Sequence, residues 1–160
     1  MTADRAPFLS PPVLLATWFG AGLAPVAPGT FGSAAALPLA LLLVWLFGWP
    51  ALLVAAAVIF VIGLWATGRY MALTGRQDPK EVVIDEVSAQ MLPLIVAPLE
   101  LLPWLAGFLL FRFFDVVKPW PCGYLDRTFH GGFGVMVDDF AAGLYALAVM
   151  ILLGELGAWQ

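Results

Sequence analysis

Apolar runs that contain few charges and are long enough to cross a lipid bilayer are the feature that most limits how this chain can fold. The clearest covers residues 51–71 and contains only Arg69 as a charged residue, close to its end. The whole chain is 62% hydrophobic and 11% charged, with a mean hydropathy of +0.96. The core of a soluble domain of 160 residues cannot hide so much apolar surface. The sequence therefore predicts an all-α, polytopic membrane protein that forms a single domain over residues 1–160.

Two other apolar runs are also long enough to span a bilayer. One begins near Thr30 and ends at the turn Gly48-Trp49-Pro50, and the other covers residues 135–153. A segment with two prolines and two glycines, residues 25–33, separates the first of these runs from the N-terminal part of the chain. These breaks favour separate helices rather than one continuous helix.

Three further apolar segments are shorter. Residues 103–114 lead into a charged stretch, and residues 87–99 are interrupted by Pro93 and Pro98. Residues 13–23 supply only about half of the ~20 residues that a spanning helix needs. We therefore expect four to five transmembrane helices, preceded by a broken or re-entrant N-terminal segment.

The distribution of positive charge predicts how the chain crosses the membrane. Its seven lysines and arginines are Arg5, then Arg69, Arg76 and Lys80, and then Arg112, Lys118 and Arg127. With five crossings these three groups fall on one side, which the positive-inside rule identifies as the cytoplasmic side. The net charge of −4 and the lack of a basic cluster argue against a nucleic-acid partner. Every polar motif is then expected at the cytoplasmic face.

Residues 111–121 place charge at the end of an apolar run. Arg112, Asp115 and Lys118 follow one another at intervals of three, which puts them on one face of a helix. The two prolines that come next cannot continue that helix, so its charged face is expected to stop at the membrane boundary. A lysine or arginine in this place can simply anchor a helix at the lipid headgroups. An aspartate between them favours a polar site.

Two further segments of the chain each carry a pair of adjacent carboxylates. Asp85 and Glu86 open one apolar segment, whereas Asp138 and Asp139 lie a few residues inside the last one. Acids at a helix N-terminus are ordinary partners of the helix dipole, but two charges inside an apolar run are costly without a cation. Together with Asp115 they place five carboxylates on one side, and hard oxygen ligands of this kind suit Mg²⁺. The sequence therefore predicts a metal site without dividing the ligands among these residues.

Basic and hydroxyl side chains accompany the acids. The three basic side chains are Arg112, Lys118 and Arg127. They can offset the charge of a transferring phosphoryl group beside a metal. Thr30 and Ser33 stand at the start of a helix, where free N–H groups favour an anion, although Thr30 also suits an N-cap. His130, the only histidine, fits either a proton donor to a leaving alkoxide or a turn residue.

Several other phosphatase and nucleotide-binding signatures are missing from the sequence. It has no G-x-x-x-x-G-K-[ST] phosphate loop and no D-x-D-x-[TV] nucleophile motif, and one histidine cannot provide a two-histidine relay. Four residues separate Cys122 from Arg127, where a cysteine-phosphatase loop needs five. We therefore expect Cys122 to be inert.

Taken together, the motifs resemble those of the bacterial phosphatidylglycerophosphatase A family. The matching segments are residues 20–33, Asp85-Glu86, residues 111–121 with Asp126-Arg127, and residues 130–143. They follow in the family's order and cover the chain from about residue 14 to residue 145. The segment from residue 74 to residue 83 matches least, which concerns loop length rather than chemistry.

The resemblance implies a Mg²⁺-dependent enzyme of the bacterial inner membrane. Such an enzyme removes the terminal phosphate of phosphatidylglycerophosphate and leaves phosphatidylglycerol. The resemblance implies a set of acidic residues that act as metal ligands, with one of them as base or nucleophile. This set is Asp85, Glu86, Asp115, Asp138 and Asp139. The implied phosphate-binding set is Thr30, Ser33, Arg112, Lys118 and Arg127, with His130 as a catalytic candidate. Either water attacks phosphorus directly, or an aspartate attacks and forms an acyl-phosphate.

Two functions of other classes stay open. A membrane transferase of phospholipid headgroups also uses Mg²⁺ and carboxylates, but the D-G-x-x-A-R…G-x-x-x-D-x-x-x-D signature of the CDP-alcohol type is absent. A non-enzymatic ion transporter would carry charges through the depth of the membrane, whereas residues 51–66 contain none.

Overall fold

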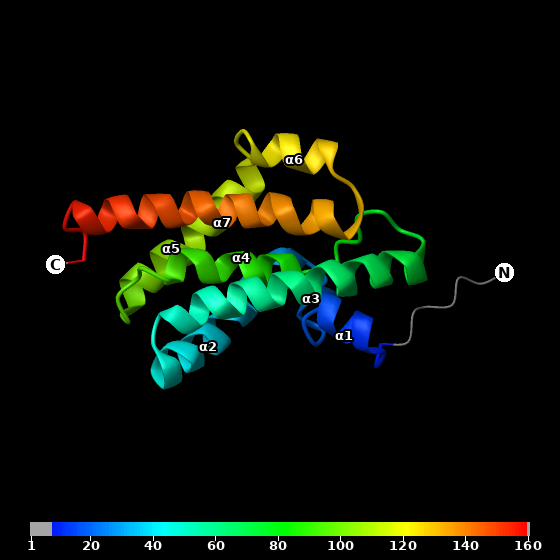
Figure 1. Cartoon of the computed structure of the whole chain (residues 1–160), viewed down its shortest axis with the longest axis horizontal. Helices are drawn as coiled ribbons and strands as arrows, with labels where there is room; N and C mark the ends of the chain where they lie inside the picture. Colours follow the sequence, from blue (N-terminus) through cyan, green and yellow to red (C-terminus); the bar gives the residue numbers. More distant parts are fainter. Residues whose placement is uncertain (1–7, 160) are drawn as a thin grey trace.

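The computed structural model describes residues 8–159, and over that range its regular structure is entirely helical (Figure 1). The elements are α1 (Pro11–Ala16), the 3₁₀ turn η1 (Ala21–Leu23), α2 (Pro28–Phe47), α3 (Pro50–Thr74), α4 (Ile84–Leu94), α5 (Leu101–Val117), α6 (Cys122–Thr128) and α7 (Gly131–Glu155). The expected all-α fold is confirmed. Arg5, which was counted among the cytoplasmic positive charges, lies outside the described residues.

Three of these helices are long and apolar enough to cross a bilayer. They are α2 with 20 residues, and α3 and α7 with 25 residues each. They correspond to the three long apolar runs of the sequence and make this chain a helical membrane protein. α5 has 17 residues, slightly fewer than the ~20 that a perpendicular span needs. The N-terminal segment is broken into α1 and η1, and the count of four to five spans stays a prediction.

The short helix α4 lies at the centre of the bundle, between α3 and α7 in Figure 1. It has 11 residues. At about 1.5 Å per residue this gives roughly 16 Å, about half the thickness of the hydrocarbon core. α2, α3, α5 and α7 all contact it, and every residue from Val87 to Leu94 is buried. The apolar run that contains Pro93 and Pro98 therefore forms a short internal helix followed by a turn.

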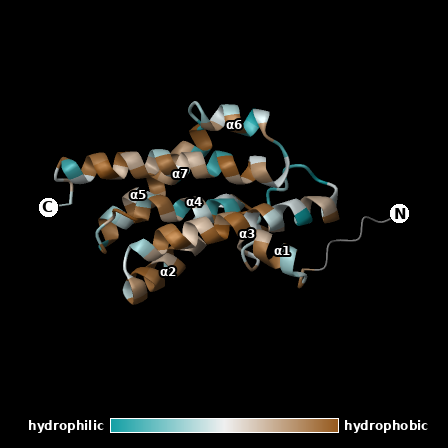
Figure 2. Ribbon diagram, in the orientation of Figure 1, coloured by the Kyte–Doolittle hydropathy of each residue, from teal (hydrophilic) through white to brown (hydrophobic). Residues whose placement is uncertain are grey.

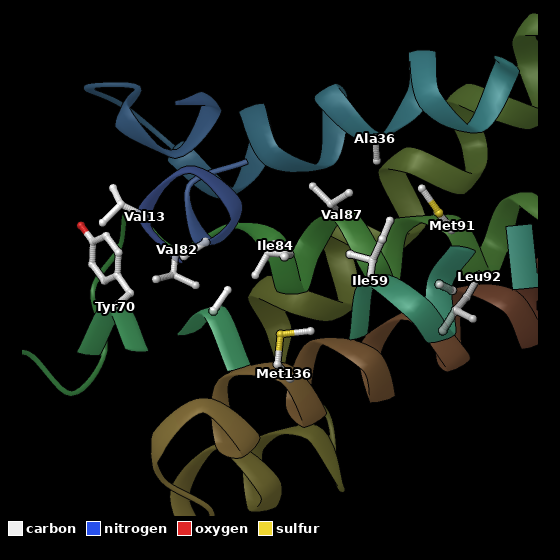
Figure 3. Close-up of a cluster of buried hydrophobic side chains, with 13 residues drawn as sticks. Val13, Ala36, Ile59, Tyr70, Val82, Ile84, Val87, Met91, Leu92 and Met136 are labelled. Atoms are coloured by element: carbon white, nitrogen blue, oxygen red, sulfur yellow. The ribbon is translucent and has the colours of Figure 1, made fainter. Parts of the chain in front are cut away.

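The largest cluster of buried apolar side chains surrounds α4 (Figure 3). Ile84, Val87 and Met91 extend from α4 into this cluster, which also contains Ile59 of α3 and Met136 of α7. Because α4 is enclosed by apolar side chains, the position of its first turn is fixed by packing on several sides.

Glycines allow neighbouring helices to approach α4 closely. A Cβ atom at Gly143 of α7 would lie 2.7 Å from the carbonyl oxygen of Ala89, and one at Gly32 of α2 would lie 2.6 Å from the Cβ of Val83. Small residues at helix contacts are typical of membrane bundles. These contacts hold the N-terminal half of α4 between α2 and α7.

Hydrophilic residues gather at one end of the bundle, as the colouring of Figure 2 shows. The C-terminal end of α3, the first turns of α4 and α7, and α6 lie there, while the rest of the long helices is mostly hydrophobic. α5 also ends there, because Lys118 adopts a left-handed conformation with a φ of 46° and Pro119 follows. The helix end expected before the two prolines is thus observed.

Candidate functional site

A cavity of about 390 Å³ opens at this polar end. The start of α2, the loop between α3 and α4, the first turns of α4 and α7, the C-terminal end of α5, and α6 all contribute to its wall. Its charged and hydrogen-bonding side chains are Gln77, Asp78, Lys80, Asp85, Glu86, Arg112, Asp115, Lys118, Asp126, His130, Asp138 and Asp139. Seven of them are carboxylates and three are lysine or arginine, so negative charge is in excess.

Three carboxylates in the cavity lie close enough to share one cation. Asp85 and Glu86 come from the first turn of α4 and Asp139 comes from α7, and each presents an oxygen atom within 4.8 Å of the other two. Asp85 and Asp139 are 7% and 5% exposed. Among the described residues, Asp85 Oδ1 and Glu86 Oε2 find no hydrogen-bond partner. Like charges in a buried site repel one another, so the geometry fits a divalent cation that prefers oxygen ligands.

The backbone of α2 passes directly beside this acidic trio at Gly29. A Cβ atom at this position would overlap Glu86 Oε1 and would lie 3.1 Å from Arg112 Nη1. Any side chain larger than hydrogen would therefore displace the carboxylate or the guanidinium. Gly29 belongs to the Pro- and Gly-rich segment of the sequence, where a close approach of backbone to the site explains a glycine.

Arg112 of α5 connects three elements of the site. Its Nη1 lies 2.6 Å from Asp115 Oδ2 and 3.9 Å from Glu86 Oε1. It also donates a hydrogen bond of 3.4 Å to Ser33 Oγ on α2. The hydroxyl of Ser33 donates in turn to the carbonyl of Gly29 at 2.9 Å. Because Ser33 is fully buried and does not line the cavity, it orients Arg112 and is not exposed to a bound phosphate.

Lys118, at the end of α5, joins α5 to α6 and α7. Its Nζ lies 2.8 Å from Asp126 Oδ1 and 2.6 Å from Asp138 Oδ2. Burial disfavours the charged ammonium, but the hydrogen bonds to the two carboxylates outweigh this effect and raise the pKa of Lys118 above the ordinary lysine value. Lys118 is therefore protonated at neutral pH and balances the buried charge of Asp138.

The structure brings most of the expected catalytic residues together but gives them different surroundings. All five predicted carboxylates line the cavity. Only Asp85, Glu86 and Asp139 form the trio, whereas Asp115 and Asp138 are each paired with a cation. His130 lines the exposed rim immediately before the first turn of α7.

Besides Ser33, two more residues of the expected phosphate-binding set do not line the cavity. Arg127 is exposed on α6 and does not line the cavity. Thr30 is half-buried in the first turn of α2 and does not line it either. The alternative role of Thr30 as an N-cap is wrong, because α2 begins at Pro28 and Ala27 occupies the cap position. The helix starts two residues earlier than expected because Pro28 can take the first helical position.

Cys122 is buried in the first turn of α6 and forms no disulfide. Burial raises the pKa of its thiol, which disfavours the nucleophilic thiolate. This environment agrees with the expectation that Cys122 is inert.

One wall of the cavity consists of residues that were not predicted from the sequence. Gln77, Asp78 and Lys80 line it from the loop between α3 and α4, a segment for which the sequence indicated only positive charge and a weak match to the family motifs. Asp126 also lines the cavity, although it was noted only as part of a motif. The position of Lys80 five residues before Asp85 is the signal that could have indicated its proximity to the site.

Comparison with known proteins shows which family the chain matches. A family model described as phosphatidylglycerophosphatase A matches residues 14–154. Phosphatidylglycerophosphatase A of Haemophilus influenzae is 40% identical over 143 residues, which are 89% of this chain and 88% of that protein. The protein of the same name from Escherichia coli is 35% identical over 153 residues, or 95% of this chain and 88% of that protein.

A third relative carries a different name. A putative phosphatidylinositol-3-phosphatase of Bacteroides thetaiotaomicron is 38% identical over 146 residues, covering 87% of this chain and 91% of that protein. No solved structure matches the chain.

Proposed function

Because this chain belongs to the phosphatidylglycerophosphatase A family, we propose that it hydrolyses the terminal phosphomonoester of phosphatidylglycerophosphate. The products are phosphatidylglycerol and inorganic phosphate, a step of phospholipid synthesis. The observation that carries the proposal is the buried acidic trio, which shares one cavity with Arg112 and Lys118 at the polar end of a membrane bundle. A cation site beside fixed positive groups is what the hydrolysis of a phosphomonoester requires.

We assign Mg²⁺ to Asp85, Glu86 and Asp139. The unpartnered oxygens of Asp85 and Glu86 support this assignment, as does the preference of Mg²⁺ for a small number of carboxylates. A bound Mg²⁺ would stabilise the negative charge of the phosphoryl oxygens and lower the pKa of a nearby water. Asp115 and Asp138, which the sequence also suggested as ligands, act in this proposal by holding Arg112 and Lys118 at the cavity wall.

The side chains around the trio divide the remaining tasks. Arg112, oriented by Asp115 and Ser33, binds phosphoryl oxygens through its planar guanidinium. Lys118 adds a second fixed positive charge on the α6 side. His130, on the exposed rim, donates a proton to the glycerol oxygen as the bond between that oxygen and phosphorus breaks.

We further propose that the cavity faces the cytoplasm at the bacterial inner membrane. Arg76, Lys80, Lys118 and Arg127 lie in the loops and the short helix at the end of the bundle where the cavity opens. Glu100 precedes α5 and Glu155 ends α7, in each case at the end of the helix that is far from the cavity. The positive-inside rule supports this orientation, and the apolar helices support a location in the membrane.

Phosphate release by the purified protein in detergent tests the proposal. The substrates are phosphatidylglycerophosphate, phosphatidic acid and phosphatidylinositol 3-phosphate, each with Mg²⁺ and with EDTA. We expect Mg²⁺-dependent release that is fastest from phosphatidylglycerophosphate. Release only from phosphatidylinositol 3-phosphate would move the substrate to the one in the name of the Bacteroides relative. No release from any of the three by folded protein would overturn the phosphatase assignment.

A further inference from the structure

The loop between α3 and α4, residues 75–83, forms one wall of the cavity and has no role in the function proposed above. It is held in place at several points. Arg76 Nη1 lies 2.8 Å from Glu81 Oε1, and the amide of Val83 donates a hydrogen bond of 2.9 Å to the carbonyl of Ala16. Pro79 is buried. Side chains on this loop are therefore presented to the cavity from an anchored backbone.

Lys80 differs from the other two cations of the cavity wall. Arg112 Nη1 lies 2.6 Å from Asp115, and Lys118 Nζ lies 2.8 Å from Asp126 and 2.6 Å from Asp138. Lys80 is exposed, and it forms no ion pair within residues 8–159. A cation whose charge is not already balanced by a carboxylate attracts an incoming anion more strongly than a paired one.

The excess negative charge of the cavity means that an anionic substrate needs an unpaired cation in order to bind. Seven carboxylates in the wall repel an anionic substrate, and two of the three lysine and arginine side chains are already neutralised. The lipid of the proposed function carries two phosphate groups, a terminal monoester and the diester that joins its glycerol to the lipid. One divalent cation on the acidic trio cannot balance both phosphates and the surrounding acids.

We propose that Lys80 is a substrate-binding residue that contacts a phosphate group of the lipid headgroup. The inference rests on the proposed function, which supplies the substrate. The ammonium group provides three hydrogen-bond donors and a compact charge, which suit a phosphate oxygen. The contacted group is either the reacting monoester or the diester, and the chemistry of the contact is the same for both.

Steady-state kinetics of Lys80→Gln on two lipids test this contact. The first lipid is phosphatidylglycerophosphate, and the second is phosphatidic acid, which has only a monoester and is measured as a substrate or as a competitive inhibitor. For the first lipid we expect KM to rise about tenfold with kcat little changed, as for one lost hydrogen bond to a charged group. Weaker binding of phosphatidic acid as well assigns Lys80 to the monoester. Unchanged binding of phosphatidic acid assigns it to the diester.

Two further variants separate a charge contact from a structural role. Lys80→Arg keeps the positive charge and should restore most of the affinity. Arg69→Gln removes an exposed cation of α3 that does not line the cavity, and its KM should equal that of the wild type. If Lys80→Gln behaves like Arg69→Gln with both lipids, the inference is wrong.

Failure of the proposed function would look different. In that case the wild type itself would release no phosphate from phosphatidylglycerophosphate. The affinity of each variant for this lipid in detergent micelles, measured by titration calorimetry, then tests Lys80 without turnover. Equal dissociation constants for the wild type and Lys80→Gln would overturn the inference there too.

Discussion

Among single residues, Asp139 allows the metal site to be tested without any measurement of turnover. Mg²⁺ that binds only the folded protein raises its stability, by about 2.7 kcal/mol at roughly one hundred times the dissociation constant. We expect Mg²⁺ to raise the unfolding temperature of the wild type and to raise that of Asp139→Asn much less. Without Mg²⁺ the variant should unfold at the same or a higher temperature, because one of three neighbouring carboxylates loses its charge. Tryptophan fluorescence during heating in detergent measures both.

Glu100→Gln is the matched control for this experiment. Glu100 is exposed and immediately precedes α5, outside the cavity. Its variant should keep the full shift with Mg²⁺. A shift in Asp139→Asn as large as that of the wild type would remove Asp139 from the metal site.

Gly29 makes a second prediction about a single residue. In Gly29→Ala the new methyl group would collide with Glu86 Oε1, so the carboxylate or α2 must move. Overpacking of this kind costs about 1–3 kcal/mol, and we expect phosphatase activity to fall by about tenfold or more because Glu86 and Arg112 are displaced. Gly68→Ala is the control, because a Cβ atom there meets nothing within 4 Å. Equal activity of the two variants would show that the contact between α2 and Glu86 is not needed.

At the scale of helices, Lys118 makes the ion pairs that fix α6 against the end of α5 and the start of α7. Lys118→Gln leaves the buried Asp138 without its cation and should lower the free energy of unfolding by about 1–3 kcal/mol. Asp126→Asn removes only the exposed partner and should cost less than about 1 kcal/mol. Chemical denaturation in mixed micelles compares the two. A larger loss in Asp126→Asn would contradict the assignment of Asp138 as the main partner.

The same ion pair predicts how stability depends on pH. The pKa of Lys118 is raised in the folded protein, so its contribution is complete below the ordinary lysine pKa and is lost only as the pH rises through the raised value. From about pH 7 to about pH 9 the difference in stability between the wild type and Lys118→Gln should therefore stay constant.

The sequence predicts the charged face of α5 but not the central position of α4. The interval of three between Arg112, Asp115 and Lys118 is a local property of one helix, and all three side chains line the cavity as expected. The central position of α4 could not be predicted in the same way. Its apolar run resembles a weak span, and its burial depends on contacts with four helices, of which α2 and α7 are distant from it in sequence.

The loop before α4 and the helix after α5 show the same limit. Lys80 and Arg127 are both basic residues close to acidic motifs, yet only Lys80 lines the cavity. The direction of each side chain follows from how its segment packs on the rest of the bundle. The motif around Arg127 carried no signal that α6 would turn this side chain towards solvent.

For the whole molecule, one end of the bundle carries the cavity and the opposite end carries the turn at Gly48 and the turn before α5. Five alternating crossings would expose these two turns outside the cell and the cavity inside it. If α4 and α5 instead enter the membrane and return, only α2, α3 and α7 span, and the turn before α5 stays within the bilayer. Both arrangements leave the cavity on one side.

Labelling of single cysteines by a membrane-impermeant maleimide decides between these arrangements. In a Cys122→Ala background we expect Trp49→Cys and Glu100→Cys to react in intact cells, because five crossings place both turns outside. Gln77→Cys and Arg127→Cys should react only after the membrane is permeabilised, since the positive loops lie in the cytoplasm. Reaction of Trp49→Cys without reaction of Glu100→Cys would reduce the number of crossings to three, and reaction of Arg127→Cys in intact cells would reverse the proposed orientation of the cavity.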